Sequence, residues 1–123
     1  MRLFKKKENK EINYLELTPK RLYGHEIKEN DGLVNVLVPK FSDKILGRII
    51  QPRLKDKYIR ANLDKIGSST WLKIDGKSNI LAIGAGLTEE FGEEIQPVNQ
   101  RVTTFFSQLY KAGFITFIEL ERN

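Results

Sequence analysis

At residues 63–76 the sequence is Leu-Asp-Lys-Ile-Gly-Ser-Ser-Thr-Trp-Leu-Lys-Ile-Asp-Gly, and this stretch holds the only tryptophan of the chain. Asp64 is a good N-cap for a short helix, because its carboxylate can accept hydrogen bonds from free backbone N–H groups at the positive end of the dipole. Apolar residues follow at helical spacing. Gly76 is predicted to end this helix, since glycine adopts the left-handed cap conformation without strain. The sequence before this stretch has the pattern of strands, and the sequence after it has the pattern of helices.

The preceding half predicts three main strands and a shorter one. Tyr58 to Leu63 leads directly into the stretch, and two further strands are expected over 23–29 and 33–38, joined by a two-residue hairpin turn at Asp31-Gly32. The second of these is almost continuously apolar, which predicts a central or doubly covered strand. A shorter strand is expected over 14–17, ended by Pro19. Between the main strands, 40–57 is predicted to be a helical insertion with a basic exterior, and 1–10 a solvated basic tail.

The following half predicts two more helices and a strand. Ser78 is expected to cap a helix over 78–91, although Gly84 and Gly86 lower its intrinsic stability by about 1 kcal/mol each. Pro97 suits the first turn of the last helix, whose apolar face should end at Gly113. The β-branched and aromatic residues 114–120 predict a closing strand. The expected fold is therefore α+β and winged-helix-like: a three-stranded antiparallel sheet, three helices and a C-terminal strand.

Composition indicates one domain without a membrane span. The chain has 123 residues, of which 40% are hydrophobic and 30% charged, with no cysteine. We expect an N-terminal extension over 1–22 and one domain over 23–120, carrying the insertion at 40–57. No apolar segment follows the basic start as a secretory signal would require, and the lack of cysteine fits a cytoplasmic protein.

The positive charge is unevenly distributed. The net charge is +5, but residues 1–60 hold 15 Lys+Arg against 8 Asp+Glu (+7), whereas residues 61–123 hold 6 against 8 (−2). The helical half is thus slightly acidic. This distribution argues against nucleic acid as a partner, because a helix that reads DNA needs cations toward the phosphates.

No catalytic constellation is found. His25 is the only histidine and is expected to be a surface residue, and the carboxylates at 89, 90, 93 and 94 are typical of a solvated helix face. Gly84-Ala85-Gly86 lies inside a helical pattern, unlike a phosphate-binding loop. Ser68 and Ser69 have no nearby base. We therefore predict no enzymatic activity, no metal site and no cofactor.

Binding remains as the function class. If the strand at 58–63 is an edge, an extended peptide can pair with its free backbone groups, and the last helix can supply an apolar wall. A DNA-binding winged helix is one alternative, although the last helix offers no cations besides Arg101 and Lys111. A second alternative is a structural or dimerising module that uses the same edge, in which case the protein forms a homodimer.

The order and spacing of several of these residues resemble the PqqD family. The matching positions are Leu63-Asp64, Gly67-Ser68, Trp71, Ile74-Asp75-Gly76, Ile80, Ile83, Leu87, Phe91-Gly92, Arg101-Val102, Phe105-Phe106, Leu109 and Gly113-Phe114-Ile115. The resemblance covers roughly His25 to Ile118 and is interrupted by the insertion at 40–57. It implies a peptide chaperone for modified-peptide biosynthesis, of which pyrroloquinoline quinone formation is the namesake pathway.

The resemblance also implies the binding site and the partners. The precursor peptide would lie between the third strand and the third helix, along Tyr58, Ile59, Arg60, Ala61, Asn62 and Leu63 and facing Val102, Phe105, Phe106 and Leu109. The peptide would be presented to a modifying enzyme, often a radical S-adenosylmethionine enzyme in this family. The insertion at 40–57 is absent from the minimal family domain and could cover this edge.

Overall fold

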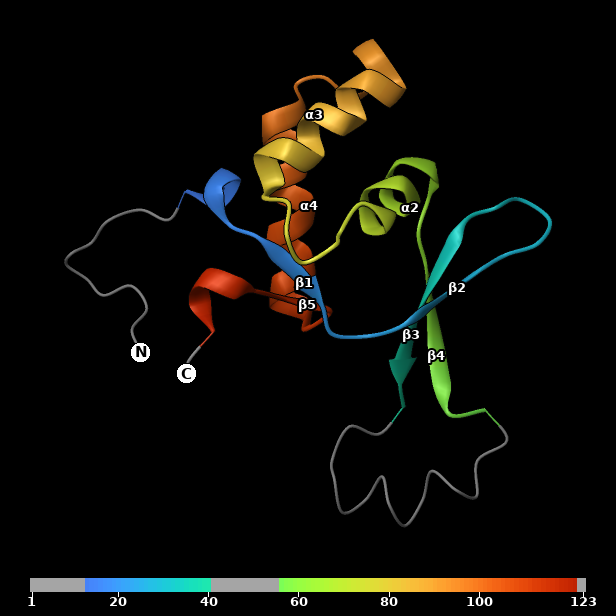
Figure 1. The fold of residues 1–123 in the computed structure, drawn as a ribbon. Helices are drawn as coiled ribbons and strands as arrows, with labels where there is room; N and C mark the ends of the chain where they lie inside the picture. The colour runs from blue at the N-terminus through green and yellow to red at the C-terminus, as the bar shows by residue number, and fades with distance from the viewer. Residues whose placement is uncertain (1–12, 41–55, 122–123) are drawn as a thin grey trace.

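The computed structural model describes residues 13–40 and 56–121, and Figure 1 shows their arrangement. The predicted basic tail at 1–10 and nearly all of the predicted helical insertion at 40–57 lie outside these residues. Within them, the strands of the first half precede the helices and one short strand follows, as in an α+β fold, and the expected layout of a three-stranded antiparallel sheet, three helices and a C-terminal strand is confirmed. No helix of the described part is long and apolar enough to cross a membrane.

The strands form two small antiparallel sheets. The larger contains β2 (His25–Ile27), β3 (Val34–Pro39) and β4 (Tyr58–Asn62) in the order β2-β3-β4, so the apolar β3 is central as predicted. The smaller pairs β1 (Pro19–Arg21) with β5 (Ile115–Phe117), bringing together two strands from opposite ends of the chain. The C-terminal strand therefore does not extend the three-stranded sheet.

The hairpin between β2 and β3 is longer than predicted. The N–H of Lys28 donates to the carbonyl of Leu33 at 2.9 Å, so the loop includes 29–32 and the predicted two-residue turn is wrong. Gly32 does have a positive φ of 73°, as the turn prediction required. The Asp31 carboxylate accepts from the N–H of Leu33 at 3.0 Å, and this local bond accommodates the wider loop.

The chain before Tyr23 contributes to the core. Tyr14–Glu16 is a 3-10 helix (η1) rather than the predicted strand, because the Asn13 side chain caps it by accepting from the N–H of Leu15. The first strand instead begins at Pro19. Both Leu17 and Pro19 are buried. The packed unit therefore includes part of the stretch assigned to an N-terminal extension over 1–22.

Helix α2 (Lys65–Leu72) is capped by Asp64, whose Oδ1 accepts from the N–H of Gly67 at 2.8 Å, as predicted. The helix ends at Leu72, four residues before the predicted stop at Gly76. The cause is the Asp75 carboxylate, which accepts from the N–H groups of Lys77 and Ser78 at 2.8 Å each. This local turn competes with continuation of the helix.

Helix α3 (Ile80–Phe91) is capped by Asn79, which accepts from the N–H of Ala82, and the prediction of Ser78 as the cap is wrong. Ser78 is not available because its hydroxyl donates to Asp75. A 3-10 helix, η3 (Gly92–Ile95), connects α3 to α4 (Val98–Ala112). Gly113 ends α4 in the left-handed conformation, as predicted. The predicted closing strand is shorter than expected, since Ile118–Leu120 forms the 3-10 helix η4.

The core lies where the helices meet both sheets. Figure 1 shows α2 between the α3–α4 pair and the three-stranded sheet. Trp71 of α2 is fully buried there. The other fully buried large side chains include Phe106, Phe117, Ile80, Leu87 and Val36. This packing leaves one side of α4 and the end of β4 facing each other across a cleft.

Candidate peptide-binding cleft

Strand β4 is an edge strand within the described residues, since the sheet order is β2-β3-β4 and β3 is its only neighbour there. The bond from the Leu63 N–H to the Val34 carbonyl, at 3.0 Å, shows which residues of the strand face β3. In an antiparallel ladder the alternate residues point their N–H and C=O groups the other way. Arg60 and Asn62, paired in register with Leu37 and Asn35, therefore present their backbone groups on the outer edge.

Only part of β4 has free backbone groups on its outer edge. Tyr58 also faces outward by the same alternation, but its N–H donates to the Asp56 carboxylate at 3.2 Å. Ile59 and Ala61 belong to the ladder with β3. Two residues, Arg60 and Asn62, are thus the part of β4 whose N–H and C=O groups have no partner among the described residues.

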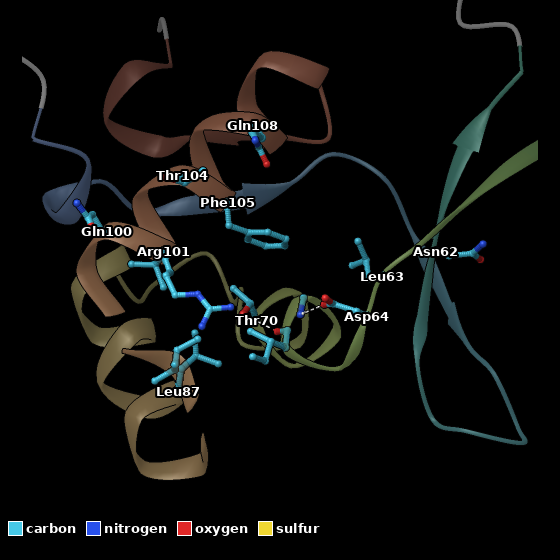
Figure 2. A pocket seen from close by; sticks show the side chains of 14 residues that line it. Asn62, Leu63, Asp64, Thr70, Leu87, Gln100, Arg101, Thr104, Phe105 and Gln108 are labelled. Carbon is cyan, nitrogen blue, oxygen red and sulfur yellow. Dashed lines mark hydrogen bonds between the residues drawn. The ribbon is translucent and has the colours of Figure 1, made fainter. Parts of the chain in front are cut away.

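A cleft of about 710 Å³ lies next to the end of β4. Its walls are the end of β4, the first turns of α2 and one side of α4, and α3 and η3 contribute one residue each. Figure 2 shows Phe105 projecting from α4 toward the side on which Leu63 lies. Apolar and polar residues both contribute to the lining: Asn62, Leu63, Asp64, Ile66, Gly67, Thr70, Leu87, Ile95, Gln100, Arg101, Val102, Thr104, Phe105 and Gln108.

The structure brings together four of the residues expected at a peptide site. Asn62, Leu63, Val102 and Phe105 all line the cleft. Of the other positions on β4, Tyr58, Ile59, Arg60 and Ala61 lie along the strand outside the cleft lining. Ile59 is 55% exposed and Tyr58 is 39% exposed.

The two remaining predicted positions are core residues. Phe106 has no exposed surface and Leu109 is 7% exposed, and neither lines the cleft. The ring of Phe106 meets that of Phe105 edge to face, with centroids 5.6 Å apart. Phe106 therefore packs behind Phe105, and Phe105 is the ring that faces the cleft.

Sequence reasoning missed the polar side of the cleft. Arg101, Thr104, Phe105 and Gln108 occupy positions i, i+3, i+4 and i+7 of α4, and all line the cleft. This spacing marks one face of a helix and could have identified them once Phe105 was selected. Ile66 and Thr70 of α2 also line the cleft and were not among the predicted site residues.

Arg60 contributes to the edge through its backbone, since its side chain is paired elsewhere. Its Nε lies 2.8 Å from Glu26 Oε2, and one terminal nitrogen lies 2.6 Å from Asp56 Oδ2. Hydrogen bonds from Asn35 and Arg60 lower the pKa of Glu26. The pKa of Asp56 is lowered by the N–H of Tyr58 and by Arg60. These ion pairs are exposed and add little stability, but they hold the guanidinium with these two carboxylates.

Ser68 joins α2 to the sheet next to Leu63. Its hydroxyl oxygen accepts from the N–H of Val34 at 2.8 Å and donates to the carbonyl of Leu63 at 3.2 Å. The side chain is buried, with 4% exposed. The hydroxyl thus replaces a direct β3–β4 backbone bond and links the end of β4 to the start of α2.

Within 13–40 and 56–121, no group of three or more His, Asp or Glu side chains lies close enough together to hold a metal ion. The cleft itself is lined by one carboxylate and one guanidinium, Asp64 and Arg101. What this arrangement offers is a strand edge beside an apolar wall, which is the geometry of strand addition.

Comparison with known families identifies one match. Residues 55–115 match the model of the family described as Coenzyme PQQ synthesis protein D (PqqD). The matched stretch begins just before β4 and reaches the first residue of β5, so it includes every wall of the cleft, while β2 and β3 lie outside it. No curated protein matches the chain. No solved structure matches it either.

Proposed function

We propose that this chain, which is PqqD-like over residues 55–115, binds an extended precursor peptide and presents it to a modifying enzyme without catalysing a reaction itself. The observation that carries the proposal is the outward-facing backbone of Arg60 and Asn62 next to the cleft between β4 and α4. A peptide added there becomes a further strand and places alternate side chains in the cleft.

Peptide binding requires both the backbone hydrogen bonds of β4 and the burial of apolar side chains in the cleft. Arg60 and Asn62 can make up to about four backbone hydrogen bonds, each contributing about 1 kcal/mol net. Association costs about 4–15 kcal/mol in lost rigid-body freedom, so these bonds alone give weak binding. Burying one Leu or Phe side chain contributes about 1.5–3 kcal/mol more. The half-buried apolar side chains of Leu63, Ile66 and Phe105 in the lining are where such anchors would be buried.

The family supplies the rest of the proposal. Its description names coenzyme PQQ synthesis, so a precursor peptide of that pathway or of a related one is the proposed ligand. The proposed partner is a modifying enzyme of the radical S-adenosylmethionine class, acting on the peptide in the cytoplasm. In this arrangement the chain contributes recognition, and the enzyme contributes the chemistry.

A self-pairing module is the second candidate, because an exposed strand edge can equally pair with a second copy of the chain. DNA binding has less support. Arg101 and Lys111 are the cations of α4, and four glutamates lie between 89 and 94 in the preceding helical segments. A phosphate backbone would meet more negative than positive charge there.

The test uses the full chain and a display library of random peptides of about 12 residues, long enough to cross the cleft at about 3.3 Å per residue. Peptides that bind should shift the amide resonances of 58–63 and of the cleft side of α4. Asn62→Pro removes an outward N–H while leaving the β3 ladder intact, and should weaken binding at least about tenfold.

The matched control is Asn62→Ala, which keeps the backbone N–H and should bind nearly as well as the wild type. If no peptide is enriched, or if enriched peptides perturb other surfaces, the proposal is wrong. A solution mass of two chains that returns to one on peptide addition would show that copies and peptide compete for the edge. A dimer unaffected by any peptide would favour the self-pairing module.

A further inference from the structure

The charged groups in the cleft bear on the chemistry of its ligand. Two charged side chains line it, Asp64 and Arg101. The Asp64 carboxylate caps α2, with Oδ1 2.8 Å from the amide nitrogen of Gly67. Its charge is therefore already compensated by the N-terminus of the helix. Arg101 is left as the charge that a ligand can meet.

Arg101 is held in place without being neutralised. One terminal nitrogen donates to the backbone carbonyl of Glu94 at 2.6 Å. Among the described residues it forms no ion pair, in contrast to Lys20, Lys28, Arg60 and Lys73, which each do. Figure 2 shows its side chain extending from α4 toward the part of α2 that carries Thr70. A guanidinium anchored at one corner still offers N–H donors in the fork geometry that suits a carboxylate.

Resting on the proposed function, we propose that the bound peptide carries an Asp or Glu side chain that pairs with Arg101, two residues away from an apolar side chain seated against Phe105. These two cleft residues are four positions apart on α4, a rise of about 6 Å. Two residues of an extended chain cover about 6.6 Å and return the side chain to the same face. The two spacings match when the peptide follows α4.

The same site disfavours a phosphorylated side chain. A phosphate carries nearly two negative charges and usually requires several cations or helix N-termini. Here a single guanidinium is the charge left to meet a ligand, because the other charged side chain of the lining, Asp64, caps α2. A singly charged carboxylate matches that balance, and arginine binds carboxylates through paired, charge-assisted hydrogen bonds.

The experiment selects random peptides of about 12 residues, joined to carrier at both ends so that no free terminus adds charge, against the wild type and Arg101→Gln. Wild-type binders should be enriched in Asp or Glu two positions from an apolar residue, and binders of the variant should not. Changing that acid to its amide should weaken wild-type binding about tenfold and leave binding to Arg101→Gln unchanged.

The control variant is Lys111→Gln, which removes one positive charge from the same helix outside the cleft lining. It should keep the preference for acidic peptides. Enriched peptides that perturb β4 but show no acidic preference would overturn this inference and leave the proposed function intact. Failure to enrich any peptide would overturn both. If both Arg101→Gln and Lys111→Gln lose the preference for acidic peptides, that preference comes from the net charge of the protein, and the inference about Arg101 is wrong.

Discussion

The indole N–H of Trp71 donates a hydrogen bond to Nδ1 of His25, with 3.1 Å between the two nitrogens. This bond connects α2 to β2 and satisfies the polar atom of a fully buried tryptophan. It also requires that Nδ1 carry no proton. His25, expected to be a surface residue, is half-buried and has a structural role.

The first prediction concerns pH. Burial, and secondarily the charge of Arg21, lower the pKa of His25 below its ordinary value. The unfolded chain therefore takes up the proton first, so stability is unaffected well above pH of about 6.5 and falls as the pH drops below it. Urea unfolding between pH 8 and pH 5 should show this loss, and His25→Gln, which does not titrate, should show less of it. Equal slopes for the two proteins would contradict the prediction.

The second prediction concerns Ser68. Ser68→Ala leaves the buried N–H of Val34 and the carbonyl of Leu63 without their bridging hydroxyl. The free energy of unfolding should fall by about 1–3 kcal/mol. Ser107→Ala is the control, since that hydroxyl bonds within its own helix and its loss should change stability by less than about 0.5 kcal/mol. Equal effects in urea titrations would show that the bridge does not matter.

The third prediction compares two glycines. An alanine Cβ at position 86 would lie 3.3 Å from Cε of Lys73, the far end of a flexible side chain that can move aside. Gly86→Ala should therefore stabilise the chain by up to about 1 kcal/mol through helix propensity. Gly92 has φ 61°, where an alanine is strained, so Gly92→Ala should destabilise it by about 1–2 kcal/mol. Thermal melts that shift in the same direction for both variants would refute the distinction.

The fourth prediction separates the adjacent phenylalanines. Phe106→Ala removes a fully buried ring and should cost about 3–5 kcal/mol of stability. Phe105→Ala removes a half-buried ring that lines the cleft, and should cost less stability while weakening a selected peptide at least about tenfold. Denaturation and peptide titration on both variants measure the two effects. If the Phe105→Ala protein retains full peptide affinity, the apolar wall formed by Phe105 is not part of the peptide-binding site.

Much of the fold follows from local chemistry in the sequence. The Asp64 cap, the third strand at Tyr58–Asn62, the left-handed end of α4 at Gly113 and the positive φ of Gly32 were all predictable from residue type and spacing. Where local prediction was wrong, a neighbouring side chain had a stronger effect. Asp75 ends α2 early and engages Ser78, which leaves Asn79 to cap α3.

What the tertiary structure alone decided depends on partners far away in the chain. Helical periodicity placed Phe105 and Phe106 on one apolar face, but neighbouring helix residues point about 100° apart, and only the packing of α4 shows which ring faces the cleft. Likewise, β5 pairs with β1 rather than extending the larger sheet, and Arg101 meets the cleft because η3 supplies the carbonyl of Glu94. Sequence by itself determines the local elements and their apolar faces, because caps, turns and periodicity act within a few residues. The cleft depends on how those faces are oriented, and that is set by contacts between residues distant in the chain.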